Sequence, residues 1–234
     1  MEISVVIPVY NEEKNISPLY ESLKRVLGGL NTSFEIVFID DGSKDASPEV
    51  LREIRKKDSC VRIVEMKNNY GQSAALDAGF KEAKGEIIIS MDADLQNDPQ
   101  DIPRLLSELK GCDVVCGWRR KRNDNLSKRI SSRIANGVRR AVLKDKIIDV
   151  GCTLRAYRRR ALGAVKLYNG LHRFLPVLIE WEGFKVKQIP VEHNRRFSGK
   201  SKYSFTKRLV KPFLDLWAVL WMKNNLLKYE KEII

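Results

Sequence analysis

The first 117 residues alternate between short apolar runs and longer segments whose apolar residues recur with a helical period. Residues 4–9, 34–39 and 86–91 are almost continuously apolar, which is typical of strands buried on both faces. Residues 12–27 carry the apolar stripe of an amphipathic helix, and residues 72–83 form a further helical segment. Strand–helix units repeated at this spacing predict an α/β fold: a doubly wound, mostly parallel sheet with helices on both faces.

The second half of the chain continues with more helix and less strand. The pattern predicts strand and loop at residues 147–157, a strand at residues 186–191 and helices at residues 126–143, 158–166, 173–182 and about 204–229. We expect one domain at residues 1–206, in which residues 118–206 complete the half formed by residues 1–117. An amphipathic helix in residues 207–234 would follow it.

Charged residues are divided unevenly between the two halves. The chain has 43 Lys and Arg against 30 Asp and Glu, a net charge of +13. Residues 1–117 carry 14 basic and 21 acidic side chains, whereas residues 118–234 carry 29 basic and 9 acidic ones. This excess indicates a polyanionic partner: a nucleic acid, an acidic membrane or a phosphate-bearing substrate.

The densest basic segment, residues 119–160, has 15 Lys and Arg and 3 acidic residues. Neither interleaved aromatic residues nor a nucleic-acid-binding motif accompanies them, so we expect no nucleic-acid partner. A solvated surface is one interpretation of such a run. A surface that faces a lipid phosphate and an anionic membrane is the other, and we favour it.

The cysteines and histidines argue against a zinc centre. Cys60, Cys112, Cys116 and Cys152 lack the CxxC spacing of zinc and redox sites, and the chain has only two histidines. We expect reduced cysteines. The N-terminal segment lacks the basic start of a secretory signal, and no run of about 18 apolar residues predicts a membrane span.

Polar residues follow the predicted strands at the edge where α/β sheets bind their ligands. The strand at residues 86–91 leads into Asp92, Asp94 and Gln96, whose side-chain oxygens are ligands that Mg²⁺ and Mn²⁺ prefer. We therefore expect one of these ions here; a turn with solvated carboxylates is the alternative. No glycine-rich phosphate loop follows the first strand, so metal and basic side chains are left to hold phosphates.

The strand at residues 34–39 leads into the segment Asp40-Asp41-Gly42-Ser43. A carboxylate at this position can accept hydrogen bonds from a nucleobase or from ribose hydroxyls. The alternative is a turn in which the aspartate caps the next helix.

Several segments together resemble a known family. They are VVIPVYNEE, IDDGSKD, NYGQSAALDAGFKEAKGEIIISMDADLQNDP and a later RFSGKSKYS element. They are similar to the inverting family 2 glycosyltransferases with the GT-A fold, in the branch of dolichol-phosphate mannose synthases and bacterial polyprenyl-phosphate glycosyltransferases. The similarity covers residues 3–120 and, more loosely, residues 126–210.

The resemblance implies a role for each matching residue. The nucleotide of a nucleotide-sugar donor would be held by Pro8, Tyr10, Glu12 and Asp41. Asp92, Asp94 and Gln96 would bind Mg²⁺ or Mn²⁺ at the donor diphosphate, and Arg196 and Lys202 would bind that diphosphate from a later loop. The acceptor phosphate would be held by Arg119, Arg129, Ser131 and Arg133. Asp149 and Arg155 match a motif near the sugar, and Asp94, Arg119 and Asp149 are the catalytic candidates.

The chemistry leaves more than one acceptor open. A lipid phosphate is already anionic and needs cations to position it, whereas a saccharide hydroxyl needs a carboxylate base, for which Asp149 is the candidate. The resemblance favours transfer of a sugar, with inversion, from a UDP- or GDP-sugar to a dolichyl or undecaprenyl phosphate. A non-catalytic nucleotide-sugar-binding subunit is a third possibility.

The closing helix carries Trp217 and Trp221 with lysines on either side, which suits a helix that lies at a membrane surface. Pro212 and Asp215 interrupt its apolar residues, so it is not expected to span the bilayer. A core or dimer helix, or a groove for a membrane-embedded partner subunit, is the alternative. We expect a cytoplasmic protein bound peripherally at the cytosolic face of the membrane, with homo-oligomer formation left open.

Overall fold

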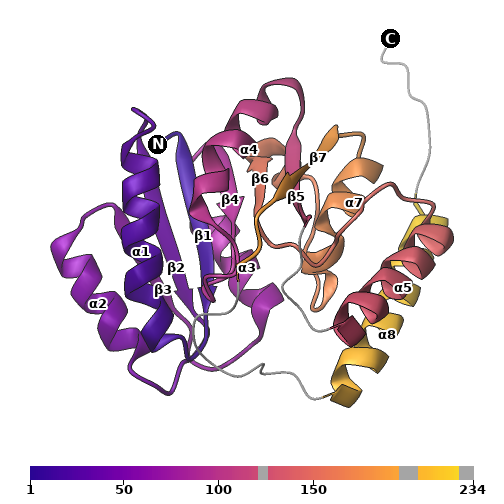
Figure 1. The fold of residues 1–234 in the computed structure, drawn as a ribbon, viewed down its shortest axis with the longest axis horizontal. Helices are drawn as coiled ribbons and strands as arrows, with labels where there is room; N and C mark the ends of the chain where they lie inside the picture. The colour runs from indigo at the N-terminus through magenta and orange to yellow at the C-terminus, as the bar shows by residue number, and fades with distance from the viewer. Residues whose placement is uncertain (121–125, 195–204, 227–234) are drawn as a thin grey trace, which may run out of the picture.

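A computed structural model describes the backbone of residues 1–120, 126–194 and 205–226 and the side chains of residues 1–120, 134–194 and 214–226. Within these residues the fold is a seven-stranded sheet between layers of helices (Figure 1). The strands are β1 (Ile3–Val9), β2 (Phe34–Asp40), β3 (Val61–Glu65), β4 (Ile87–Ser90), β5 (Val114–Arg119), β6 (Arg155–Arg158) and β7 (Val186–Val191). The helices are α1 (Glu13–Gly28), α2 (Ser47–Lys57), α3 (Gln72–Glu82), α4 (Ile102–Glu108), α5 (Leu126–Leu143), α6 (Arg159–Gly163), α7 (Leu175–Trp181) and α8 (Phe205–Asn224), with the 3₁₀ helices η1 (Pro99–Asp101), η2 (Leu109–Gly111) and η3 (Leu171–Phe174).

The strand order is β3-β2-β1-β4-β6-β5-β7. All paired strands run parallel except β6, which is antiparallel to both β4 and β5. This confirms the predicted α/β fold with a mostly parallel sheet. Because β6 is inserted between β4 and β5, the two halves of the chain share one sheet. The boundary expected after residue 117 lies inside β5, and that expected after residue 206 lies inside α8.

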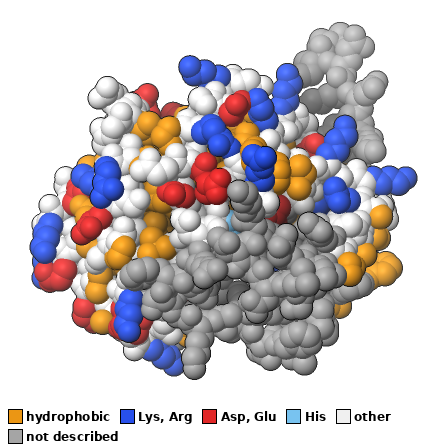
Figure 2. Space-filling model, viewed as in Figure 1, with side chains coloured by type: hydrophobic (Ala, Val, Ile, Leu, Met, Phe, Trp, Pro, Cys, Tyr) orange, Lys and Arg blue, Asp and Glu red, His pale blue; other side chains and the backbone are white. Residues whose placement is uncertain are grey.

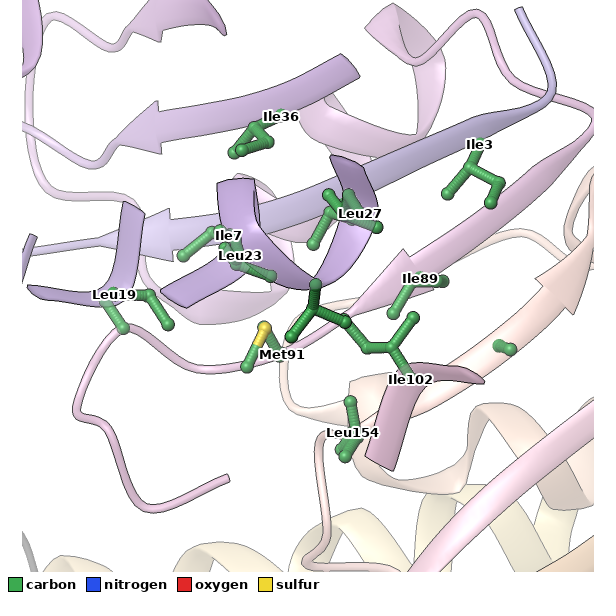
Figure 3. Packing of buried hydrophobic residues seen from close by; sticks show 14 of the residues in the cluster. Ile3, Ile7, Leu19, Leu23, Leu27, Ile36, Ile89, Met91, Ile102 and Leu154 are labelled. Atoms are coloured by element: carbon green, nitrogen blue, oxygen red, sulfur yellow. The ribbon is translucent and has the colours of Figure 1, made fainter. Parts of the chain in front are cut away.

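One face of the sheet is covered by α1, α2 and α4. Leu19, Leu23 and Leu27 of α1 are fully buried and pack with Ile7 and Ile36 of the strands (Figure 3). The apolar stripe predicted for this helix is therefore the side that it buries. Apolar residues at alternate positions of each strand belong to this cluster.

The opposite face is covered by α3, α6 and α7, which bury the other strand residues, Val6 and Val37 among them. At Gly79 of α3, a Cβ atom would lie 2.4 Å from Cγ1 of Val6, so only glycine lets this helix lie so close to the sheet. A third cluster joins α5, α7 and α8 and includes Leu143, Leu216 and Val219.

The carboxyl ends of β2, β1 and β4 lie side by side. Val9, the last residue of β1, pairs with Asp40, the last residue of β2, and β4 runs parallel to β1 on its other side. The polar segments that follow these strands therefore share one edge of the sheet, as the strand-end argument expects. Their loops and those of β5 and β6 build the candidate site.

Two further expectations can be checked against the described residues. All four cysteines are free. Burial raises the pKa of the Cys116 thiol to about 12 and that of Cys152 to about 11, so both remain protonated thiols at neutral pH. No helix in the described part of the chain is both long and apolar enough to cross a membrane.

Candidate functional site

A pocket of about 460 Å³ lies at the carboxyl ends of β2 and β3. Tyr10, which follows β1, and Asp40, which ends β2, line it together with parts of residues 42–44 and 66–69. Its volume is within the range of small-molecule sites. Sequence reasoning selected Tyr10 and the Asp40–Asp41 pair, of which it chose Asp41, but missed Asn68 and Asn69. The two asparagines could have been found from the sequence, because polar residues that follow β3 lie at the same edge of the sheet as those that follow β2.

Asp41 binds the backbone of a neighbouring loop at this edge of the sheet. Its carboxylate is buried and accepts hydrogen bonds from the Tyr70 amide at 2.7 Å, the Gly71 amide at 2.8 Å and Nδ2 of Asn69 at 2.9 Å. Burial raises the pKa of Asp41, against the lowering effect of the two backbone hydrogen bonds. The aspartate therefore orders the loop of residues 69–71 from which α3 begins, and Asp40 is the member of the pair that lines the pocket.

Pro8 and Glu12 lie near the same edge but do not line this pocket. Pro8 is a half-buried residue of β1. The amide of Glu12 donates to Oγ of Ser47 at 2.8 Å, and its carboxylate accepts a hydrogen bond from Nδ2 of Asn15 in the first turn of α1. The structure therefore places Glu12 at the start of α1, where it joins this helix to α2.

The loop after β4 carries the predicted metal ligands. Asp92 accepts a hydrogen bond from Nε2 of Gln72 at 2.7 Å, so the first residue of α3 contacts this loop directly. Asp94 is buried, and its Oδ1 accepts the backbone amide of Gln96 at 3.2 Å. Leu95 between them has a φ of +61°, a left-handed conformation that is costly for a leucine.

The residues of this loop fit a hard divalent cation. Asp92, Asp94 and Gln96 offer oxygen donors, which Mg²⁺ and Mn²⁺ prefer. Within the described residues, no group of three or more His, Cys, Asp or Glu side chains could hold a metal by itself. Water and substrate phosphates commonly complete the ligands of a magnesium ion.

Arg119 and Asp149 meet in a bidentate ion pair. Nε of Arg119 lies 2.7 Å from Oδ2 of Asp149, and Nη2 lies 2.9 Å from Oδ1. Oδ1 also accepts the amide of Gly151 at 3.1 Å. Asp149 is buried, and both of its oxygens are engaged, so the structure presents it as the partner of an arginine rather than as an unoccupied base.

Gly151 lies close to this pair. A Cβ atom at this position would lie 2.7 Å from Nη2 of Arg119, so a larger residue here would require the guanidinium to shift.

Arg155 lies beneath that loop and is buried. Its guanidinium donates to the carbonyls of Val150 at 2.6 Å, Cys152 at 2.8 Å and His172 at 3.0 Å. It therefore joins the loop to η3. This arginine is therefore a buried residue that positions backbone.

Several other basic residues of 119–160 have partners inside the protein. Arg139 is buried with Asp145, Nη1 to Oδ1 2.9 Å, and Arg160 pairs with Asp113. Arg158 and Arg159 donate to backbone carbonyls at the ends of η2 and α3. The interpretation of this segment as a surface that faces phosphates is therefore wrong for Arg139, which is buried, and for Arg158 and Arg159, which bind backbone carbonyls, whereas Arg160 is exposed.

The remaining predicted residues cannot be placed to the same extent. Arg129, Ser131 and Arg133 belong to α5, but their side chains lie outside the described residues. Arg196 and Lys202 also lie outside the described residues. Their roles remain predictions.

Comparison with known proteins identifies the family of this chain. Residues 4–165, which run from β1 to beyond α6, match the family described as Glycosyl transferase family 2. The chain belongs to this family. The match confirms the resemblance seen in the sequence, and it includes the loop with Asp92 and Asp94 and the Arg119–Asp149 pair.

The curated relatives of this family 2 chain are similar over nearly all of its length. A dodecaprenyl-phosphate galacturonate synthase of Rhizobium johnstonii is 37% identical over 94% of this chain and 67% of the relative. Undecaprenyl-phosphate 4-deoxy-4-formamido-L-arabinose transferases are 40% identical in Edwardsiella ictaluri, over 93% of this chain and 67% of the relative, and 41% in Pseudomonas fluorescens, over 92% and 63%. The chain thus spans about two thirds of the length of these relatives.

Solved structures share the fold. Glucosyl-3-phosphoglycerate synthase of Mycobacterium tuberculosis, crystallised with Mn²⁺ and UDP-glucose, has a TM-score of 0.72 at 19% identity, over 95% of this chain and 79% of that one. A mannosyltransferase of Pyrobaculum calidifontis, in complex with GDP-mannose and Mn²⁺, has a TM-score of 0.68 at 19% identity, over 93% and 63%. The GT-A-type fold expected from the sequence is confirmed.

Proposed function

We propose that this chain is an inverting, metal-dependent glycosyltransferase that moves a sugar from a UDP- or GDP-sugar to a polyprenyl phosphate. Relatives that are 37–41% identical over more than nine tenths of the chain carry dodecaprenyl or undecaprenyl phosphate in their names, which supports the acceptor class. Nucleotide sugars and Mn²⁺ bound in two proteins of the same fold support the donor and metal classes.

The observation that carries the proposal is the Arg119–Asp149 ion pair. It fixes the orientation of the Arg119 guanidinium at the end of β5, while both oxygens of the candidate base are already engaged. An anionic nucleophile needs such a cation and no base, whereas a hydroxyl acceptor needs a carboxylate within reach of its proton. The pair therefore favours a phosphate acceptor.

In the proposed reaction, an oxygen of the lipid phosphate attacks the anomeric carbon of the donor sugar. The bond from that carbon to the nucleoside diphosphate breaks on the opposite face, which inverts the configuration. Asp92, Asp94 and Gln96 would hold a divalent cation, which supplies positive charge to the departing diphosphate. Arg119, whose orientation Asp149 fixes, would hold the acceptor phosphate in line.

The test is a panel of UDP- and GDP-linked hexoses, uronic acids and formamido-pentoses, supplied with Mn²⁺ and a short polyprenyl phosphate. We expect at least one donor to yield a nucleoside diphosphate and a lipid-linked sugar. EDTA and Asp94→Asn should each abolish this turnover. Asp98→Asn is the matched control, because Asp98 caps η1 by accepting the Gln100 amide at 2.9 Å. Absence of release with every donor would overturn the proposal.

Two rivals are separated by the acceptor in the same assay. If the dephosphorylated polyprenol or a free saccharide is glycosylated as fast as the polyprenyl phosphate, the enzyme uses a hydroxyl acceptor. If nucleotides bind in the presence of Mn²⁺ but no acceptor supports release, the chain is a non-catalytic nucleotide-sugar-binding subunit.

We also infer that α5 and α8 form a face that binds the membrane. Leu214, Trp217 and Trp221 lie on one side of α8 and are 64–67% exposed. Leu216 and Val219, on the other side of that helix, are buried in the cluster that α8 shares with α5 and α7. Figure 2 shows exposed hydrophobic side chains at the right-hand edge, where Figure 1 places α5 and α8.

A second apolar row supports this inference. Ile134, Val138 and Val142 of α5 are exposed at four-residue intervals, and α5 packs against α8. Exposed Arg140 and Lys144 are close to this row in the sequence. Tryptophans with nearby cations suit the headgroup region of an anionic membrane, where a lipid acceptor resides. A membrane-embedded subunit and a second copy of the chain are the alternative occupants of this face, which the test must distinguish from a membrane.

A further inference from the structure

Three segments meet at Asn97: the loop of Asp92 and Asp94, the loop of Asp149 and the residues that follow β7. This residue ends the loop of Asp92 and Asp94 and is buried. Its Nδ2 donates to Oγ1 of Thr153 at 3.0 Å, which joins it to the loop of Asp149. It also forms an isolated antiparallel bridge with His193, and the amide of the next residue, Asn194, donates to the Gln96 carbonyl at 2.9 Å.

Thr153 is held from two directions. Its carbonyl accepts a hydrogen bond from Oγ of Ser90, the last residue of β4, at 2.7 Å, and its hydroxyl accepts the bond from Asn97. Ser90 precedes, and Asn97 ends, the loop of residues 92–97, which carries the predicted metal ligands and is called the metal loop below. The 149–154 loop is therefore hydrogen-bonded at both ends of the metal loop. Residues 149–154 themselves belong to no helix or strand.

The metal loop needs such a support. Residues 92–97 belong to no helix or strand, and Leu95 adopts the left-handed conformation with a φ of +61°. Backbone in that conformation persists only where the surroundings hold it in place. The buried Asn97 side chain is one such constraint, and it lies three residues from Asp94.

We propose that the Asn97–Thr153 hydrogen bond is a positioning contact that sets the separation between the donor side of the site, at Asp94, and the acceptor side, at Arg119 and Asp149. This inference rests on the proposed function, because it assigns the two loops to the two substrates. Asn97 and Thr153 act through other residues and touch neither substrate. A misplacement of about 1 Å between reacting groups can lower a rate by about 10²-fold, so a contact of this kind governs turnover.

The first test compares two substitutions of one residue. Thr153→Val keeps the shape and removes the hydroxyl, and Thr153→Ser keeps the hydroxyl. We expect Thr153→Val to lower kcat about tenfold or more, with nucleotide affinity in Mn²⁺ changed less than about twofold, and Thr153→Ser to retain most of kcat. Equal losses in the two variants, or a loss confined to nucleotide affinity, would overturn the inference.

A double-mutant cycle adds a second criterion. If the two side chains act through one contact, Asn97→Ala combined with Thr153→Val should be no slower than the poorer single variant. Multiplying losses would mean that they act separately. Should Asn97→Ala fail to fold, the comparison of Thr153→Val with Thr153→Ser still decides.

The last test needs neither activity nor a ligand. Amide hydrogen exchange of residues 94–97 is measured in the ligand-free protein, and Thr153→Val is expected to accelerate it at least about fivefold over Thr153→Ser. Unchanged exchange there would refute the contact between the loops. Because exchange is independent of turnover, accelerated exchange without any sugar transfer would contradict the proposed function alone. Transfer with normal kcat in Thr153→Val would contradict this inference alone.

Discussion

Arg119 and Asp149 lie 30 positions apart in the sequence and form a bidentate ion pair, with nitrogen–oxygen distances of 2.7 and 2.9 Å. Both side chains are largely removed from solvent. A planar guanidinium bound on one edge has a fixed orientation, which a lysine could not adopt. In the proposed function, the pair fixes the orientation of the arginine on the acceptor side.

Substitutions of Arg119 and of Asp149 are expected to have different effects on turnover. Arg119→Ala is expected to lower kcat/KM for polyprenyl phosphate by about 10²–10³-fold, since it removes a preorganised donor. Arg119→Lys should recover little, because an ammonium cannot form the bidentate contact. Asp149→Asn keeps the size of the side chain and should cost less than Arg119→Ala. Steady-state kinetics over a range of acceptor concentrations provide the measurement.

The pH profile is the control for this prediction. If Asp149 served as a general base, Asp149→Asn would remove the acidic limb of the pH–rate profile and would cost at least as much as Arg119→Ala. We expect the acidic limb to persist. A larger loss in Asp149→Asn than in Arg119→Ala would contradict the positioning role of Asp149.

The buried Arg139–Asp145 pair is expected to matter for stability. The two side chains are 4% and 0% exposed, and Arg139 also donates to the carbonyl of Ile147. Burial lowers the pKa of Arg139, against the attraction of Asp145. Asp145→Ala leaves a buried cation without this partner and should lower the free energy of unfolding by about 3–5 kcal/mol, measured by urea denaturation.

An exposed ion pair supplies the matched control. Lys56 and Glu53 form a pair on the surface of α2 at 2.6 Å, and Lys56→Ala should change the free energy of unfolding by no more than about 1 kcal/mol. Replacing both buried partners, as in Arg139→Met with Asp145→Leu, should recover most of the loss. Equal effects of Asp145→Ala and Lys56→Ala on the free energy of unfolding would show that the buried pair contributes no more to stability than the exposed pair.

Asp58 is expected to contribute to acid sensitivity. Its carboxylate accepts hydrogen bonds from Lys24 at 2.6 Å, Tyr20 at 2.8 Å and the Cys60 amide at 2.9 Å. Burial acts to raise the pKa of Asp58, but these hydrogen bonds outweigh it and lower the pKa from its ordinary value of 3.8 to about 2.

The stabilisation of the folded protein by Asp58 depends on pH. Because the folded-state pKa lies below the unfolded one, the stabilisation by Asp58 is complete above about pH 4 and is lost as the pH falls towards 2. Asp58→Asn should therefore be less stable than the unaltered protein at pH 6, and the difference should shrink between pH 4 and pH 2. Urea midpoints across this range provide the measurement, and a constant difference would refute the prediction.

Membrane binding should depend on the exposed side of α8. Trp217→Ser combined with Trp221→Ser is expected to lower binding to vesicles that contain anionic lipid at least about tenfold, because two interfacial aromatic groups are lost. Flotation with the vesicles provides the measurement, and Tyr70→Ser, which alters an exposed aromatic residue of the 69–71 loop, is the control. Unchanged flotation together with a change from dimer to monomer would assign this surface to a second copy instead.

Much of the first half could be predicted because its signals are local. The apolar runs before residues 10, 41 and 92 identify strands, and the stripe from Ile16 to Leu27 identifies the buried side of α1. The strand-end rule then selected Tyr10, Asp92 and Asp94 for one edge. Each of these inferences needs only a short window of sequence and the fixed side-chain periods of helix and strand.

The helices and the strand of the second half lie close to where the sequence pattern predicts them, but the order of its strands in the sheet could not be predicted, for a physical reason. The insertion of β6 antiparallel between β4 and β5 depends on pairing between residues about 40 to 70 positions apart, as between Ser90 and Arg155, which no local period records. A basic run likewise has the same composition whether its arginines face solvent or bind internal carbonyls.

The sequence by itself determined the α/β class, the family and the oxygen-rich loop after β4. Only the tertiary structure decided the partner of each charge: Arg119 with Asp149, Arg139 with Asp145, and Asp41 with the 69–71 loop. The reason is that the energy of a buried charge depends on the groups that surround it in space, whereas strand and helix patterns depend on neighbours along the chain.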